Sequence, residues 1–305
     1  DKEIERLLQS YKESQKESTR IVIIKGKSGT GKTSLAYELF RSPETIGMLF
    51  ARGRYEKLTR GVPFSGLLMA TRDIIQMIQS SQEDQRQKWI AHWKDRIKTS
   101  GPMLASLVPE ITSIIGEQEP LPELQPQETQ NLLYNAFLDL ISAASSMQRP
   151  LVILLDDIQW ADQGTIELLQ EVTKPLSEQK GILFISTCRT EELSADNPVN
   201  MAIEKLTQEN SIISEILLKP IQREDAINII NTTYPMEPQT SQEFGSAICN
   251  ISGGNPFFLR QLLETLYTQY QNARSQSHPQ NSPVITFDTI EGLWQWDQEA
   301  LSKLA

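Results

Sequence analysis

A short apolar segment that runs directly into a glycine-rich loop constrains this chain more than any other feature. Residues Arg20 to Lys25 read RIVIIK, a β-branched run typical of a buried strand. The loop from Gly26 to Thr33 follows at once and matches G-x-x-x-x-G-K-[ST] at every fixed position. Helical spacing resumes from Ser34 to Phe40. This order of elements predicts a phosphate-binding unit, whereas a chance glycine-rich turn would not be expected to have both neighbours.

The loop supplies the groups that a nucleoside triphosphate needs. Its glycines allow backbone N–H groups to turn toward phosphate oxygens, and the helix that follows directs its positive end at the anion. Lys32 can reach the β- and γ-phosphates, and the Thr33 hydroxyl can bind Mg²⁺. We therefore expect ATP and Mg²⁺ as cofactors. The expected nucleotide-binding residues of the loop are Gly26, Lys27, Ser28, Gly29, Thr30, Gly31, Lys32, Thr33 and Ser34.

Two adjacent acids complete the predicted site. The apolar run from Leu151 to Leu155 ends in Asp156 and Asp157. A buried strand can deliver a carboxylate at its end to hold Mg²⁺, usually through water, and Asp156 suits that role. Asp157 is placed to orient or activate an attacking water. A surface turn is the alternative for Asp-Asp alone, but the phosphate loop upstream favours the metal site.

Further apolar runs alternate with helical patterns and predict the fold class. An α/β fold follows, with a parallel sheet covered by helices on both faces. The stretch from Ser100 to Gln127 contains four prolines and is expected to be irregular, with short helical turns. The remaining predicted strands are Met48 to Ala51, Ile182 to Ser186 and Ile212 to Leu218, and the helices between them are Asp162 to Leu176 and Pro198 to Thr207.

The pattern changes to helices alone after Lys219. We expect an α/β nucleotide-binding domain over residues 1–219 and a small α-helical lid domain over residues 220–270. Residues 271–282, rich in Gln, Ser and Asn, predict a flexible linker. Residues 283–305 are expected to begin a further domain. Its first element would be a hairpin of Val284 to Phe287 and Leu293 to Trp296.

Composition excludes several classes of function. The net charge of −10 argues against the broad basic surface that nucleic acid requires. No apolar run is long enough to span a bilayer. Two cysteines give no disulfide framework, so we expect a cytoplasmic location. The amphipathic pattern begins immediately after Asp1, which suggests a piece of a longer protein.

The segment from Asp156 to Asp162 reads DDIQWAD and resembles a signature of STAND-type, AAA-like P-loop ATPases, which have an origin-recognition-like ATPase domain. The resemblance covers nearly the whole chain. It implies a P-loop NTPase sheet, ATPase activity, and kinase or sensory domains in the same longer chain, with self-association as a further option. The other matching segments are Gly61 to Ser65, Pro109-Glu110, Pro122 to Leu124, Gly253 to Phe258 and Trp294 to Asp297.

The resemblance also implies roles for two further residues. Pro256 would pack on the adenine from the second domain, although the same proline can simply open a helix. Arg189 matches a polar sensor position near the γ-phosphate, and a solvated surface arginine is the alternative. No arginine finger is assigned. Arg52, Arg54 and Arg60 are candidates by position only.

The expected function is an ATP-binding, Mg²⁺-dependent conformational switch in a signalling protein, with slow hydrolysis as the reset. ATP would bridge the two domains. Three alternatives stay open at this point: a ring-forming motor ATPase, a scaffold whose nucleotide is never hydrolysed, and a DNA-loading ATPase. The acidic charge disfavours the last of these.

Overall fold

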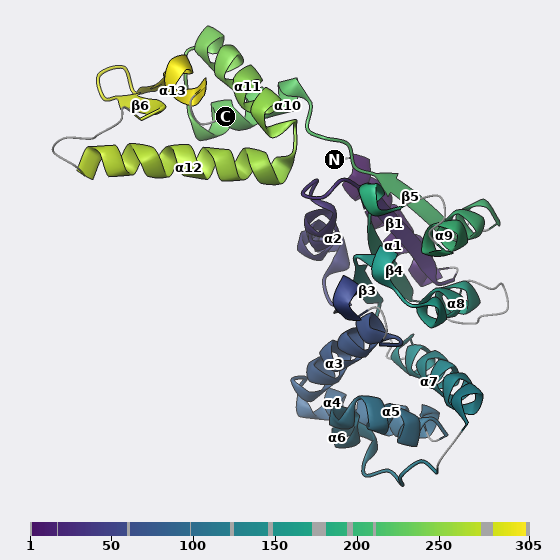
Figure 1. Ribbon diagram of the computed structural model, residues 1–305. Coiled ribbons are helices and arrows are strands. Elements are labelled where there is room, and N and C mark those ends of the chain that lie inside the picture. The colour runs from purple at the N-terminus through teal and green to yellow at the C-terminus, as the bar shows by residue number, and fades with distance from the viewer. Residues whose placement is uncertain are drawn as a thin grey trace. The chain divides into compact units, whose positions relative to one another are not determined.

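The computed structural model divides into two compact units (Figure 1). The first comprises Asp1–Gly26 and Lys32–Leu217, and the second comprises Lys27–Gly31 and Leu218–Ala305. The structure describes residues 2–16, 18–59, 62–97, 99–122, 125–145, 149–172, 181–193, 198–209, 212–275 and 283–302.

A five-stranded parallel sheet with the order β2-β3-β4-β1-β5 forms the centre of the first unit. The predicted α/β fold is therefore confirmed. Two strands extend further than the apolar runs alone indicated, because β2 continues to Arg54 and β4 continues to Arg189. These extensions carry charged side chains to the carboxyl edge of the sheet. The strands are β1 (Arg20–Gly26), β2 (Leu49–Arg54), β3 (Leu151–Asp156), β4 (Ile182–Arg189) and β5 (Ile213–Leu217).

Helices cover both faces of the sheet, as the continuous apolar strands require. In β1, Ile21 and Ile23 belong to a core shared with helices α3, α7, α8 and α9. Val22 and Ile24 point to the opposite face because side chains alternate along a strand, and they are equally buried. Helices α1 and α2 contact β1 and β4. The bounds are α1 (Lys2–Lys16), α2 (Lys32–Arg41), α3 (Ser65–Gln79), α7 (Pro126–Ser145), α8 (Gln163–Val172) and α9 (Pro198–Glu209).

A block of helices from α3 to α7 lies between β2 and β3 in the sequence (Figure 1). The segment expected to be irregular indeed contains only short helices before α7. Trp93 is fully buried in the core of this block. The other helices here are α4 (Glu83–Arg96), α5 (Gly101–Leu107) and α6 (Thr112–Ile115), and the 3₁₀ turns of the unit are η1 (Pro43–Thr45), η2 (Lys57–Thr59), η3 (Pro109–Ile111), η4 (Ile158–Trp160) and η5 (Thr190–Glu192).

The helical block meets the sheet at two glycines. A Cβ atom on Gly53 of β2 would lie 2.0 Å from the backbone oxygen of Gly66 in α3. A Cβ atom on Gly66 would lie 2.5 Å from the ring of Tyr55. No side chain fits at either position, so the backbones of β2 and α3 touch directly.

The second unit has its own core, formed by helices and a hairpin. Helices predominate after Lys219. None of the described helices is long and apolar enough to cross a membrane. The elements are α10 (Arg223–Thr233), α11 (Pro238–Ser252), α12 (Pro256–Ser275), β6 (Ile285–Asp288), β7 (Leu293–Trp296) and α13 (Gln298–Ser302).

The second unit differs from the sequence prediction in two places. Helix α12 continues to Ser275, so the first residues of the expected linker are helical because no Gly or Pro interrupts them. The rest of that linker, residues 276–282, lies outside the described residues. The hairpin does form, but it packs on the helices instead of starting a separate core. Val284 and Ile285 are buried in the helical core, and the Trp296 ring lies 5.2 Å from that of Phe244.

Candidate functional site

The glycine-rich loop connects the end of β1 at Gly26 to the start of α2 at Lys32. Gly29 and Gly31 have φ angles of +77° and +89°, which residues with a side chain rarely adopt. Thr30 closes the turn, because its N–H and its hydroxyl both donate to the Lys27 carbonyl, at 3.3 Å and 2.8 Å. The loop therefore has the strand–loop–helix setting that its sequence predicted.

Lys32 is withdrawn from water at the base of this loop. It is 7% exposed, and its Nζ donates to the Gly26 carbonyl at 3.0 Å. Burial lowers the pKa of Lys32, and the nearby Glu191 and Asp157 act in the opposite direction. A partly desolvated ammonium at a helix N-terminus is a strong partner for an anion, because water no longer competes for it.

The two residues that the sequence proposes as metal ligands, Thr33 and Asp156, are hydrogen-bonded to each other. The Thr33 hydroxyl donates to Oδ1 of Asp156 at 2.9 Å, and the Thr187 hydroxyl donates to the same oxygen. Hydroxyl and carboxylate oxygens are ligands that Mg²⁺ prefers. Among the described residues no group of three or more His, Cys, Asp or Glu side chains could hold a metal.

Asp157 is enclosed by positively charged and amide groups. Arg189 donates to it through Nε to Oδ1 at 2.8 Å and through Nη2 to Oδ2 at 3.1 Å. Gln159 donates to Oδ1 at 3.0 Å, and Nη2 of Arg54 lies 3.6 Å from Oδ2. The bond to Asp157 raises the pKa of Arg189. Two residues that the sequence proposed separately, one as water activator and one as phosphate sensor, are therefore ion-paired.

Two residues of this site were not predicted. Thr187 donates to Asp156 and accepts the Asp157 N–H at 3.0 Å, so one hydroxyl fixes both acids. Gln159 is fully buried and accepts the Arg189 N–H at 3.2 Å. Gln159 could have been noticed in the DDIQWAD segment. Thr187 could not, because its partners are about thirty positions away in the sequence.

The end of the DDIQWAD segment has a structural role. Asp162 accepts the backbone N–H of Thr165 at 3.0 Å, within the first turn of α8, and the N–H of Phe64 at 2.8 Å. Tyr55 and Thr165 share a hydrogen bond of 3.1 Å beside it. This part of the motif holds α8 to the start of α3, so it supports the acids without joining them.

The remaining predicted residues fall into two groups. In the first unit, Ser34 is exposed on α2, and Arg52 binds the Tyr37 hydroxyl at 3.3 Å. Arg60, together with Gly61, Glu123 and Leu124 of the matching segments, lies outside the described residues. In the second unit, Pro256 is the first residue of α12, which agrees with the alternative that this proline opens a helix, and it also lines a pocket.

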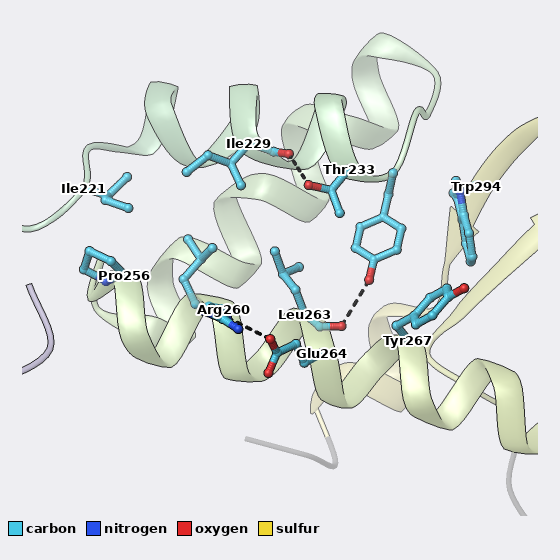
Figure 2. A pocket seen from close by; sticks show the side chains of 11 residues that line it. Ile221, Ile229, Thr233, Pro256, Arg260, Leu263, Glu264, Tyr267 and Trp294 are labelled. Carbon is cyan, nitrogen blue, oxygen red and sulfur yellow. Dashed lines mark hydrogen bonds and ion pairs between the residues drawn. The ribbon is translucent and has the colours of Figure 1, made fainter. Parts of the chain in front are cut away.

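That pocket lies entirely within the second unit, between α10 and α12, with Trp294 of the hairpin at one end (Figure 2). Its volume is about 670 Å³. The polar groups on its wall bond to one another: Tyr234 donates to the Leu263 carbonyl at 3.1 Å, and Thr233 donates to the Ile229 carbonyl at 2.8 Å. The surface offered to an occupant is therefore mainly apolar.

The parallel sheet, the phosphate loop after β1 and the acids after β3 together define a P-loop ATPase domain. The family model for the AAA ATPase domain matches residues 1–185, and this chain belongs to that family. The resemblance to AAA-like P-loop ATPases drawn from the sequence is confirmed.

Individual relatives are distant. Over 173 residues the chain is 27% identical to hybrid signal transduction histidine kinase G of Dictyostelium discoideum. The match covers 55% of this chain and 5% of that protein. Among solved structures it resembles Cdc6p from Pyrobaculum aerophilum, with 14% identity, a TM-score of 0.48, and 88% and 62% of the two chains covered. A STAND protein with a tetratricopeptide repeat sensor from Pyrococcus horikoshii matches with 12% identity, a TM-score of 0.36, and 97% and 41% covered. The chain thus spans less than two thirds of each of these proteins.

Proposed function

We propose that this chain is an ATP-binding, Mg²⁺-dependent module that hydrolyses ATP slowly and acts as a conformational switch within a longer signal-transduction protein. The observation that carries the proposal is a pair of contacts beside the phosphate loop, at the carboxyl edge of the sheet. Thr33 is hydrogen-bonded to Asp156, and Arg189 is ion-paired with the adjacent Asp157. An ATPase site needs both a place for the metal and a group near the attacking water.

Different residues of the chain would bind the phosphates and the metal. The loop from Gly26 to Thr33 would hold the phosphates through backbone N–H groups, and Lys32 would supply the positive charge. Thr33 and Asp156 would hold the metal, directly or through water. Bound Mg²⁺ would neutralise charge on the β- and γ-phosphates.

The proposal of slow turnover is supported by the ion pair of Asp157. A general base must offer a carboxylate oxygen to water, and here both oxygens accept hydrogen bonds from Arg189. Bidentate arginine–carboxylate pairs are among the strongest hydrogen-bonded pairs in proteins. Asp157 would therefore act on water only after Arg189 has moved. The γ-phosphate of bound ATP is an alternative anion for Arg189 to pair with. Pairing with it would be the sensor role that the sequence predicts for Arg189.

In the proposed switch ATP bridges the two domains, with its phosphates on the loop from Gly26 to Thr33 and its adenine against Pro256. Pro256 lines an apolar pocket of about 670 Å³, which is large enough for a purine base. ATP would shift the equilibrium between arrangements to the extent that it binds one of them better.

A signalling context is supported by the hybrid histidine kinase relative, of which the chain spans 5%. Kinase or sensory domains of the same longer chain are the partners we propose, together with self-association. A cytoplasmic location is proposed because both cysteines are free. Burial raises the pKa of the Cys188 thiol to about 12, so this thiol stays protonated and unreactive at neutral pH.

Two measurements on the wild-type chain test the proposal. Calorimetric titration should show binding of ATP that depends on Mg²⁺, and phosphate release should be measurable but slow. Absence of binding would refute the proposal. Binding without any turnover would instead favour the scaffold alternative, for which the ion-paired Asp157 is the specific supporting observation. Fast turnover in a nucleotide-dependent ring would favour the motor alternative.

A further inference from the structure

The phosphate loop is hydrogen-bonded to the start of α12, and both partners belong to the second unit. The side chain of Asn255 donates through Nδ2 to the Ser28 carbonyl at 2.8 Å. The N–H of Phe257 donates to the Gly29 carbonyl at 3.2 Å. A Cβ atom on Gly29 would lie 2.6 Å from Oδ1 of Asn255, so the loop approaches this side chain too closely for any residue but glycine at position 29.

Asn255 has a second role that must be separated from the first. Its Oδ1 accepts the N–H groups of Phe257 at 3.0 Å and Phe258 at 3.4 Å, so it caps the N-terminus of α12. The amide oxygen therefore serves the helix, and the amide nitrogen serves the loop. A carboxylate could replace the oxygen but not the nitrogen.

The direction of the two loop carbonyls has a chemical consequence. In a trans peptide the C=O and N–H groups point in opposite directions. Holding the Ser28 and Gly29 carbonyls toward α12 therefore turns the N–H groups of Gly29 and Thr30 away from it. The Thr30 N–H indeed faces away from α12, because it donates within the loop to the Lys27 carbonyl at 3.3 Å. Inward N–H groups are what a phosphate-binding loop presents to its anion.

We infer that Asn255 is a positioning residue for the phosphate loop: its Nδ2–H holds the loop with N–H groups inward, and nucleotide binding is coupled through it to the start of α12. This inference rests on the proposed binding of ATP at the loop. Because coupling between two sites is reciprocal, a nucleotide that orders the loop also stabilises the first turn of α12.

The test uses two variants that keep the cap and remove the donor. Asn255→Asp is isosteric and retains an acceptor for Phe257, while Asn255→Ser is a neutral cap without an amide nitrogen. Asn250→Asp, on the exposed surface of α11, is the matched charge control. Loss of one hydrogen bond predicts an increase of about three- to tenfold in the Kd for Mg-ATP in both test variants and none in the control.

Hydrogen exchange supplies a readout that a purely structural cap would not change. Without nucleotide, both variants should exchange faster than wild type in the peptides covering 27–31. With Mg-ATP, wild type should gain protection at Phe257 and Phe258, and the variants should gain much less. If both variants match wild type in affinity and in protection, the inference is overturned while the proposed function stands. If wild type itself binds no Mg-ATP, the proposed function fails, and nucleotide coupling through Asn255 fails with it.

Discussion

Arg189 and Asp157 form a two-point ion pair, with Nε 2.8 Å from Oδ1 and Nη2 3.1 Å from Oδ2. The pair lies at the carboxyl edge of the sheet, where Asp157 follows β3 and Arg189 ends β4. Asp157 itself has a φ angle of +59°, a conformation that non-glycine residues seldom adopt. Both the backbone and the side chain of Asp157 are therefore constrained. In the proposed mechanism, Asp157 can act on water only when it is not paired with Arg189.

Replacing Lys32 should remove most of the affinity for ATP. Lys32→Ala takes away the buried ammonium, and hydrogen bonds to charged groups contribute about 1.5–3 kcal/mol, so the Kd should rise by about 10- to 150-fold. Calorimetric titration with Mg-ATP measures the change, and Lys88→Ala on the exposed side of α4 is the control. Wild-type affinity in Lys32→Ala would contradict the assignment of the phosphate loop.

The two acids should separate binding from turnover. Asp156→Ala should weaken Mg²⁺-dependent binding, since it removes the carboxylate next to Thr33. Asp157→Asn should keep binding and slow phosphate release, because the amide preserves the shape but cannot accept a proton. Titrations with and without Mg²⁺, together with single-turnover assays, distinguish the two. An equal loss of affinity in both variants would mean that their roles are wrongly divided.

Removing the Thr187 hydroxyl should affect both acids at once. Thr187→Val keeps the side-chain shape but leaves the buried Asp157 N–H without its acceptor and removes one of the two hydroxyls that donate to Asp156, the other being that of Thr33. The free energy of unfolding should fall by about 1–3 kcal/mol, and Mg²⁺-dependent affinity should fall with it. Denaturant unfolding and titration check both effects against Thr190→Val, three residues further along. An unchanged Mg²⁺ dependence would show that Thr187 does not position the metal ligand.

The burial of Lys32 predicts a pH dependence of stability. Burial lowers the pKa of Lys32 in the folded chain, so folding favours its neutral form. Its contribution is fully present above the lysine pKa of the unfolded chain, about 10, and is lost as the pH falls through the lower folded value. The stability of wild type relative to Lys32→Met should therefore rise as the pH is raised from 7 toward 10. Nucleotide-free denaturant titrations measure this rise, and a flat difference would show that Lys32 is well hydrated.

Pro256 should matter less for affinity than Lys32 but more for the protection of the second unit. Pro256→Gly removes apolar contact from the pocket wall and leaves the phosphate charges paired. Tryptic cleavage after the exposed Arg223 should be slowed by Mg-ATP in wild type, and much less in the variant. Cleavage that is indifferent to ATP in wild type would argue that the helical unit does not respond to nucleotide.

The sequence predicted what short-range patterns encode. The phosphate loop, the strand before it and the helix after it could all be read directly, because glycine spacing and apolar periodicity act locally. The same holds for the acids after β3. The length of α12 was missed because Gln, Asn and Arg residues near its end are compatible with either a helix or a polar linker.

What could not be predicted depends on pairing between strands. The neighbours β3 and β4 bring Thr187 to Asp156 and Arg189 to Asp157, although neither strand order nor strand length is visible in a single sequence. The hairpin was recognised, but its place on the helical core was not. That place depends on Val284 and Ile285 finding partners elsewhere in the second unit.

The glycine contact between β2 and α3 bears on protein engineering. Gly53 and Gly66 meet backbone to backbone, and Arg54, next to Gly53, reaches toward Asp157. The helical block from α3 to α7 could therefore be transplanted into another P-loop domain only if the graft keeps Gly66 and the recipient strand supplies a glycine at the position of Gly53. A chimera with alanine at either position would push the grafted helices away from the sheet and displace the neighbouring Arg54. Whether such a graft fits therefore depends on the lack of a side chain at these two positions.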